Sequence, residues 1–268
     1  AHDTSAPHPS TDSLGDRLSA VAAQHIDHAF RRVLRGPGVT MERAFVRLIT
    51  RAPHPFGNLA VVSDPTDQPG TVAATVPLID CGAPAAVLLP GQASAAVADH
   101  LARSGFAGAG SMPAMVVNVD ALRPTALPGG YEMACVATAE SDAWAQAFAA
   151  GYELPAVLGE AFSPRTAGVT TAEDAPLQYF AVVRNGRMVC TSVLYLAHGV
   201  AGIYCVSTVP EERGKGLAAH ATAEPLRLAR KLGYGVGVLQ SSHAGHSVYL
   251  KLGFADVGEL PLYVRTPA

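Results

Sequence analysis

Apolar residues near the start of the chain recur at the spacing of an α-helix. The positions that share one helical face are Leu14, Leu18, Val21, Phe30 and Val33. Thr11 or Ser13 can cap such a helix, and the Gly-Pro-Gly segment 36–38 interrupts it. The pattern therefore predicts a helix that runs to about Leu34.

Short apolar runs bounded by turn residues predict strands in the rest of the first half. These runs cover residues 44–50, 58–63, 85–90 and 113–119. A helical pattern covers 94–106 and stops near Gly105. Residues 121–130, ALRPTALPGG, combine two prolines with two glycines, which is typical of a linker.

The second half is richer in strands. Residues 177–197 form a clear hairpin pattern, with Asn185-Gly186 as its turn. Further strands are predicted at 131–137, 201–208, 235–240 and 259–265, and helices at 141–154, from about 216, and at 244–252. The order β-α-β-β-β-α-β-α-β indicates a mixed α/β fold with a central antiparallel meander, and not a doubly wound sheet.

These patterns divide the chain into three parts. Residues 1–12 are polar and proline-containing and are predicted to be a disordered tail. Residues 13–128 are predicted to form a smaller N-terminal α/β domain, and residues 129–268 a second domain.

Composition and charge narrow the classes of function. The chain has 268 residues, 49% of them hydrophobic, so a full core is expected. The formal net charge is −3 without a long run of one sign, which argues against a nucleic-acid partner. No run of about 20 apolar residues occurs, so no membrane partner is expected. The dispersed cysteines, which form no CxxC pair, predict reduced thiols in a cytoplasmic protein; they are Cys81, Cys135, Cys190 and Cys205.

Residues 209–220, VPEERGKGLAAH, place glycines and cations between a predicted strand and a predicted helix. The N-terminus of a helix presents unpaired N–H groups and about half a positive charge. Gly214 and Gly216 allow the backbone to close on a ligand oxygen. Arg213 and Lys215 add formal charge at the same place, so the segment predicts a pyrophosphate site.

Two other phosphate-binding motifs fit this segment less well. The nucleotide-triphosphate loop, GxxxxGK[ST], requires Ser or Thr where this chain has Gly216. The dinucleotide motif, GxGxxG, lacks its third glycine because Ala219 stands there, and it belongs early in a βαβ unit.

The segment resembles the phosphate loop of the GNAT superfamily of acyl-CoA-dependent N-acyltransferases. The family pattern is [QR]-x-x-G-x-[GA], and residues 213–218 read RGKGLA. A second segment, VYLKLGF at 248–254, is similar to the one that closes the family's fold. The resemblance covers about residues 130–268 and implies a GNAT fold there.

This resemblance implies that acetyl-CoA is the cosubstrate and that the loop binds its pyrophosphate. The strand before the loop would bind the acyl group and pantetheine arm through its backbone, and strand 235–240 would splay away from it. A coenzyme contact carries over to Val206, Ser207, Thr208, Arg213, Gly214, Lys215, Gly216, Leu217, Ala218, Ala219 and Ser242. Many family members have Asn at the position of Ser242, so that contact departs from the pattern.

Tyr249 matches the family's general-acid tyrosine. In the implied reaction an amine attacks the thioester directly, and a phenol within reach can protonate the leaving thiolate. Spacing assigns no base; the candidates are Glu160, Glu173 and His243, and a water chain is equally suitable.

Other reactive residues have plainer explanations. His243 and His246 have the spacing of metal ligands, but no third ligand is near, so no metal is expected. Cys190 and Cys205 lie on apolar strands and are expected to be inert core residues.

The first half contains a helix and strand, 94–119, that resemble the closing portion of a GNAT domain. Residues 91–95, GQASA, contain no arginine and form no phosphate loop. We therefore expect a degenerate GNAT-like half that shapes the acceptor pocket together with loop residues 153–176.

The predicted function is acetyl-CoA-dependent N-acetyl transfer to a small-molecule or peptide amine. The alternative is a catalytically idle acyl-CoA-binding or sensor domain. A fold that has lost its functional site is disfavoured because the loop is intact. A homodimer is possible on the sequence alone.

Overall fold

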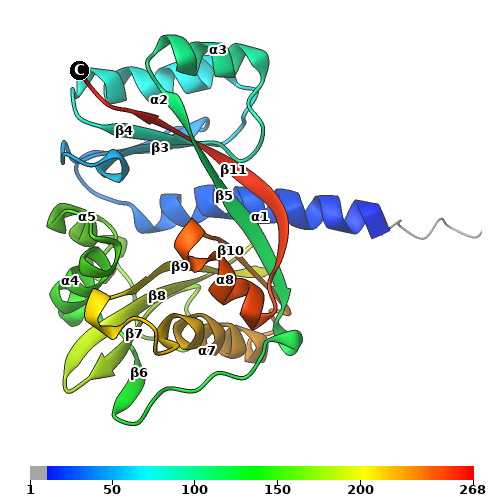
Figure 1. Ribbon diagram of the computed structural model, residues 1–268, viewed down its shortest axis with the longest axis vertical. Helices are drawn as coiled ribbons and strands as arrows, with labels where there is room; N and C mark the ends of the chain where they lie inside the picture. The colour runs from blue at the N-terminus through cyan, green and yellow to red at the C-terminus, as the bar shows by residue number, and fades with distance from the viewer. Residues whose placement is uncertain (1–10) are drawn as a thin grey trace, which may run out of the picture.

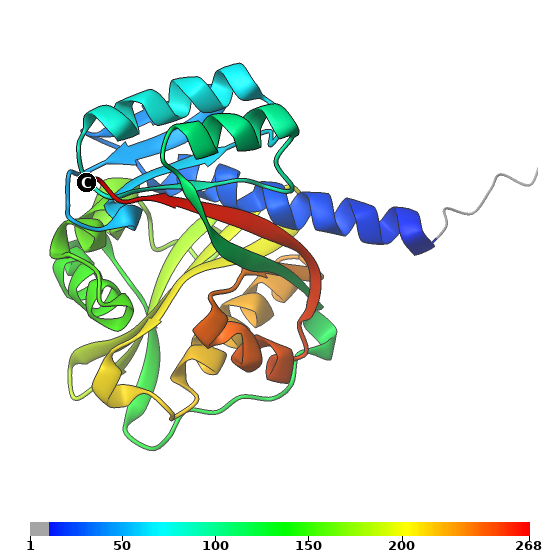
Figure 2. The same cartoon turned by 45° about the horizontal axis from the view of Figure 1, so that its top comes forward.

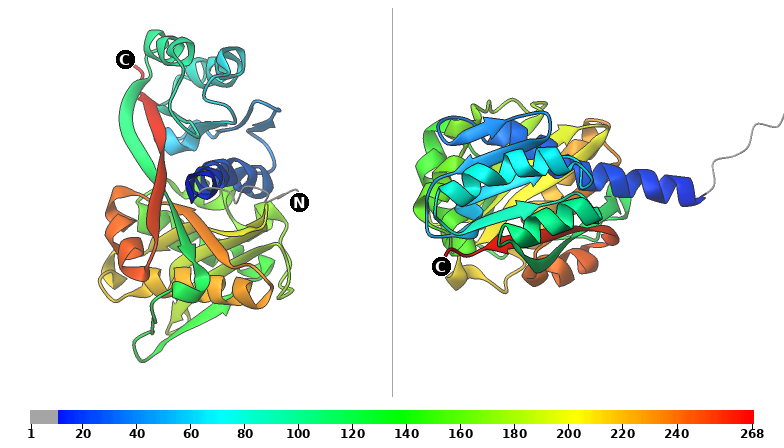
Figure 3. Two further views of the ribbon diagram at one scale, coloured as in Figure 1. Left: turned by 90° about the vertical axis from the view of Figure 1, so that its right-hand side faces the viewer. Right: turned by 90° about the horizontal axis from the view of Figure 1, so that it is seen from above.

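The computed structural model describes residues 11–268, so the predicted tail lies outside the described residues except for its last two. Those two begin helix α1 (Thr11–Val33), close to the predicted helix. α1 runs between two lobes of the molecule, as Figure 1 and the left view of Figure 3 show. The largest cluster of buried side chains joins α1 and strand 45–49 to helix 141–152 and strands 177–197, so the two lobes share a core.

The first half contains three helices and five strands. In chain order after α1 they are β1 (Val39–Met41), β2 (Phe45–Ile49), β3 (Asn58–Val62), α2 (Gln68–Asp80), β4 (Ala85–Leu88), α3 (Ala95–Arg103) and β5 (Ala107–Asn118). A 3-10 turn, η1 (Pro55–Gly57), precedes β3.

The second half follows after a stretch without helix or strand. Its elements are β6 (Tyr131–Cys135), α4 (Ser141–Tyr152), α5 (Ala156–Ala161), α6 (Pro164–Ala167), β7 (Leu177–Arg184), β8 (Arg187–Ala197), β9 (Val200–Thr208), α7 (Leu217–Lys231), β10 (Val236–Gln240), α8 (His243–Leu252) and β11 (Ala255–Arg265). The predicted strands, hairpin and helices of this half are present within a few residues of their expected bounds.

The described strands form one mixed sheet in the order β1-β2-β3-β4-β11-β5-β10-β9-β8-β7-β6. β6 to β9 make the expected antiparallel meander, and β10 joins β9 in parallel. The prediction of a mixed α/β fold is therefore confirmed. Among residues 11–268 no helix has both the length and the hydropathy needed to cross a bilayer.

One arrangement of elements occurs twice along the chain. The unit strand–helix–strand–helix–strand is β3-α2-β4-α3-β5 in the first half and β9-α7-β10-α8-β11 in the second. The last strand of each unit crosses to the other: β11 lies between β4 and β5, and β5 lies between β11 and β10. Figure 2 shows these two long strands running side by side from one lobe to the other. The division into domains near residue 128 stays a prediction, and this exchange connects its two parts.

Helix α2 is absent from the sequence-based expectations. Its buried face consists of Gly70, Thr71, Ala74, Thr75 and Leu78, whereas the apolar Val76 is exposed, so no apolar stripe marks it as a helix. The Asp67 side chain caps it by accepting a hydrogen bond from the Gly70 N–H at 2.9 Å.

Candidate active site

The segment 209–216 connects β9 to the N-terminus of α7 through the 3-10 turn η4 (Pro210–Glu212). Gly214 and Gly216 have φ values of 78° and 76°, in the left-handed region that only glycine adopts without strain. A Cβ built at either glycine would have no neighbour within 4 Å, so the space beside the turn is open. This open turn has room for a ligand against the backbone.

The N-terminus of α7 has no side-chain cap. The helices α2, α3 and α8 are capped by Asp67, Ser94 and Ser242, respectively. The free N–H groups of the first turn of α7, with Leu217 buried beneath them and Ala218 and Ala219 beside it, are therefore available to an anion.

The two cations of the loop are bound within the protein. Arg213 donates from Nη2 to the carbonyl oxygen of Gly151 at 2.6 Å, which ties the loop to the end of α4. Lys215 donates from Nζ to Glu212 at 2.6 Å and to the Tyr131 hydroxyl at 3.1 Å. Main-chain N–H groups, more than these side chains, are thus the groups that the loop presents.

Glu212 is the centre of a polar cluster that the sequence analysis did not detect. It is 8% exposed and accepts hydrogen bonds from Lys215, Tyr131 and Arg184. These donors, Lys215 first, lower the pKa of Glu212 to about 2. Only the Glu212–Lys215 spacing is visible in the sequence, because Tyr131 and Arg184 are far away along the chain.

Strand β9 separates from β10 as the resemblance implied. The two pair only at Ala201–Gly237 and Gly202–Val238, although β9 continues to Thr208. On its other side β9 has a bulge, because Tyr204 and Ser207 pair with Val193 and Thr191 across a register shift. The parting of the strands exposes the backbone of β9 near Val206.

The side chains of two predicted contact residues on β9 are already engaged. The Ser207 hydroxyl donates to the Phe148 carbonyl at 2.8 Å, and the Thr208 hydroxyl lies 3.4 Å from the Cys190 sulfur. Val206 lines the cavity described next.

A cavity of about 170 Å³ opens where β9 and β10 part. The second half supplies most of its wall from α4, α5, β9 and β10, including Tyr152, Leu158, Cys205 and Gln240. The first half supplies Ile26, Phe30, Phe56, Leu59, Leu88 and Met112. Both halves thus enclose one site, as expected for a first half that shapes the pocket.

Tyr249 on α8 lines this cavity and is 8% exposed. Burial raises the pKa of its phenol well above the usual range. The phenol therefore stays protonated at neutral pH, and its hydroxyl lies near that of Thr222 on α7.

The remaining candidates from the sequence lie outside the cavity wall. Ser242 caps α8 by accepting from the Gly245 N–H at 3.2 Å. His246 contacts Asp256 at 2.8 Å, and no group of three metal-ligating side chains occurs among the described residues. Glu173 and His243 are absent from the wall, so neither is placed as a base at Tyr249.

The two cysteines of the second-half strands differ in position. Cys190 is fully buried, and burial raises the pKa of its thiol to about 11. Cys205 is half-buried at the cavity wall, and burial raises its thiol pKa further. Both thiols are protonated at neutral pH, as inert residues would be.

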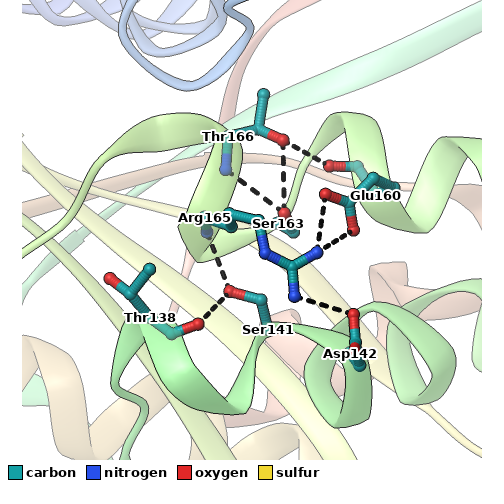
Figure 4. A network of polar contacts seen from close by, with 7 residues as sticks. All are labelled: Thr138, Ser141, Asp142, Glu160, Ser163, Arg165 and Thr166. Atoms are coloured by element: carbon teal, nitrogen blue, oxygen red, sulfur yellow. Dashed lines mark hydrogen bonds and ion pairs between the residues drawn. The ribbon is translucent and has the colours of Figure 1, made fainter.

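Arg165 holds the helices that form one side of the cavity. Figure 4 shows it between Glu160 on α5, at 3.0 Å, and Asp142 on α4, at 2.8 Å. Its main-chain N–H also donates to the Ser141 hydroxyl at 2.9 Å. Glu160, a candidate base, is therefore paired with a guanidinium outside the cavity.

The counterpart of the phosphate loop in the first half is the segment 63–67, SDPTD, between β3 and α2. Residues 91–95, which contain no arginine and were not expected to form a phosphate loop, instead precede α3. Asp67 occupies the helix N-terminus with its own carboxylate, and Asp64 adds a second negative charge. This segment repels an anion, so the open helix N-terminus of the second unit has no equivalent in the first.

Comparison with known proteins agrees with this geometry. Residues 141–254 match the acetyltransferase (GNAT) family. No curated protein matches the chain.

Solved structures match across almost the whole chain. A GCN5-related N-acetyltransferase from Kribbella flavida is 20% identical with a TM-score of 0.61, covering 92% of this chain and 95% of its own. One from Sphaerobacter thermophilus is 15% identical with a TM-score of 0.59, covering 94% and 93%. A tandem GNAT protein from the clavulanic acid biosynthesis pathway is 14% identical with a TM-score of 0.54, covering 96% and 95%. Residues 141–254 therefore match the acetyltransferase (GNAT) family, within a chain that has the fold of these solved structures.

Proposed function

We propose that the protein transfers the acetyl group of acetyl-CoA to an amine, and that the catalytic site lies where β9 and β10 part. The observation that carries this proposal is the uncapped N-terminus of α7, with two left-handed glycines, next to a cavity that contains Tyr249. The free amides and helix dipole favour a pyrophosphate. The empty space beside Gly214 and Gly216 fits such a group.

In the proposed reaction, the backbone of β9 near Val206 positions the thioester between the parted strands. The amine nitrogen forms a bond to the carbonyl carbon while the carbon–sulfur bond breaks. Tyr249 donates its phenolic proton to the departing sulfur, the attacking nitrogen releases its proton to solvent, and the phenolate regains a proton from solvent. Burial raises the pKa of this phenol, so the group is protonated when the thioester binds.

The first experiment tests the acid. Tyr249→Phe should lower kcat by about 100-fold or more, because general acid catalysis is removed. Tyr234→Phe, outside the cavity wall, is the matched control and should retain wild-type kcat. Both proteins should bind coenzyme A with unchanged affinity in a calorimetric titration. Unchanged turnover of Tyr249→Phe would remove this residue from the mechanism.

A second experiment tests the loop. Arg213→Ala should weaken coenzyme A binding because the loop loses its tie to Gly151. Arg187→Ala, which breaks an exposed pair with Glu211, is the control. Tight coenzyme A binding by the wild type without thiol release for any amine would favour the idle acyl-CoA-binding alternative.

We also propose a reducing, cytoplasmic setting, since all four cysteines are free thiols in the structure.

A further inference from the structure

The cavity that contains Tyr249 is lined almost wholly by carbon. No Asp, Glu, Lys, Arg or His is among its lining residues in the described part of the chain. Polar atoms come only from the hydroxyls of Tyr152, Tyr204 and Tyr249, the thiol of Cys205 and the amide of Gln240, apart from main-chain groups. The site therefore contains no formal charge that could balance a cation.

Two carboxylates of the adjoining helices are paired elsewhere. Glu160 and Asp142 both pair with Arg165 and face a separate depression on the outside of α4 and α5. Placing an unpaired ammonium in an apolar cavity costs several kcal/mol, and such a group instead gives up its proton. An acceptor can lose the charge of its reacting amine in this way, but a second ammonium on the same molecule would stay charged and unpaired.

Gln240 offers the cavity a single oriented acceptor. Its Nε2 donates to the carbonyl oxygen of Ala22 at 2.7 Å, which fixes the amide plane. Its Oε1 is buried and has no hydrogen-bond partner. Gln240 is the last residue of β10, where the strands have parted, and it belongs to the cavity wall.

Tyr204 also lines the cavity, but its hydroxyl is hydrogen-bonded to another residue of the protein. Its hydroxyl lies 2.5 Å from Nδ1 of the buried His25, and the two rings are stacked. Gln240 Oε1 is thus the buried side-chain acceptor at the wall that has no internal partner.

The size and rim of the cavity fit an apolar body. Its volume of about 170 Å³ is close to the roughly 150 Å³ at which a dry cavity accepts benzene. Phe56 belongs to the wall and yet is 37% exposed, so the wall is apolar there up to the solvent. An aromatic ring or a short alkyl chain can therefore enter and contact mainly apolar side chains.

We propose that the acceptor is an amine with one amino group on an aromatic or alkyl body, and that Gln240 Oε1 accepts a hydrogen bond from the attacking nitrogen. The body fills the apolar cavity between the two halves. Polyamines and other acceptors with several cations are excluded. This inference rests on the proposed acetyl transfer.

The test compares amines that differ by one cation. The pairs are hexylamine against 1,6-diaminohexane, and 4-methylbenzylamine against 4-(aminomethyl)benzylamine. We expect kcat/KM, measured as thiol release from acetyl-CoA, to be at least about tenfold higher for the monoamine of each pair, since a tenfold ratio corresponds to only 1.4 kcal/mol. Equal or higher values for the diamines would overturn the inference while leaving acetyl transfer intact.

Two variants connect this preference to the cavity. Phe56→Glu places a carboxylate at the exposed rim and should shift each pair toward the diamine by about tenfold, and Phe56→Asp is a second variant for the same purpose. Val76→Glu, at a residue that is 45% exposed on α2 and outside the wall, is the control and should leave both ratios unchanged. Unchanged ratios in both rim variants, with wild-type melting temperatures, would contradict the assignment of the cavity.

Gln240→Met tests the hydrogen bond. It should raise KM for hexylamine by about five- to tenfold, as expected for one lost hydrogen bond, without changing the affinity for coenzyme A. An unchanged KM would remove Gln240 from the acceptor site. Absence of thiol release with every amine, despite coenzyme A binding, would instead refute the proposed function itself.

Discussion

At the residue scale, the phosphate loop separates what a sequence can predict from what it cannot. The need for Gly214 and Gly216 could be predicted, because a tight turn before a helix favours residues that accept positive φ. The roles of Arg213 and Lys215 could not, because their partners Gly151 and Tyr131 lie far from them in the sequence. In the structure the side chains of Arg213 and Lys215 bind groups of the protein, whereas the sequence predicted that they contact the ligand directly.

Replacing Gly214 should reveal this backbone requirement. Gly214→Ala puts a Cβ on a residue with φ of 78° and should lower the free energy of unfolding by about 1 kcal/mol. It should also weaken coenzyme A binding, because the turn changes shape. Gly15→Ala on the exposed face of α1 is the control, and there helix propensity should raise stability by about 0.5–1 kcal/mol. Urea unfolding and a coenzyme titration measure both effects, and a Gly214→Ala protein as stable as wild type would show that the turn tolerates a side chain.

His25 should make stability depend on pH. It is 1% exposed, and burial, followed by the nearby His198 and His28, lowers its pKa from 6.5 to about 4. The unfolded chain therefore binds a proton that the folded chain does not between these values, so stability is lost as the pH falls below 6.5. We expect a loss of about 2 kcal/mol between pH 7 and pH 5 from this residue.

The His25→Phe variant isolates that contribution. Its unfolding free energy should fall less steeply over the same pH range, whatever its absolute stability after losing the contact with Tyr204. Identical slopes for the variant and the wild type would show that His25 does not titrate as described.

At the element scale, a helix could be predicted where a single apolar stripe marks it, and a strand where an apolar run or an alternation of apolar and polar residues marks it. The hairpin β7–β8 has an Asn-Gly turn between apolar runs, and it was predicted almost to the residue. Helix α2 was missed because its buried face carries glycine and threonines while a valine is exposed, and α5 and α6 were missed because they are too short to show a period. The apolar wall of the site could not be predicted either, since it unites elements that only the fold brings together.

The turn η4 depends on the carboxylate of Glu212, which joins the loop to β6 and β7. Glu212→Gln should lower the melting temperature and raise KM for acetyl-CoA, because the amide cannot balance both Arg184 and Lys215. Glu211→Gln, next along the chain, breaks only the exposed pair with Arg187 and should change neither quantity appreciably. Equal effects of the two substitutions would show that the cluster does not anchor the loop.

At the scale of the whole molecule, the exchange of β5 and β11 connects the two lobes, and we expect them to unfold as one cooperative unit. The linker and the change of pattern near residue 128 suggested two domains from the sequence. Strand pairing across that point could not be predicted, because β4 and β11 are separated by most of the chain. The fold family of the second half was recognisable from two short motifs, and the family match at 141–254 confirms it.

Cooperativity can be measured with the single tryptophan, Trp144, which is buried in the second half. Leu78→Ala creates a cavity in a cluster confined to the first-half elements and β11, and should destabilise the protein by about 2–5 kcal/mol. If the lobes unfold together, Trp144 fluorescence reports this loss in full, as it should for Leu226→Ala in the second half. A Trp144 transition unaffected by Leu78→Ala would show that the lobes unfold separately.

The position of β11 also determines when the protein can fold during synthesis. This strand fills the gap between β4 and β5, yet it is translated after every other strand described. Until it leaves the ribosome, the nascent first lobe has open strand edges, which are the surfaces that recruit other chains or chaperones. The lobe that is made first is therefore among the last parts of the protein to become native.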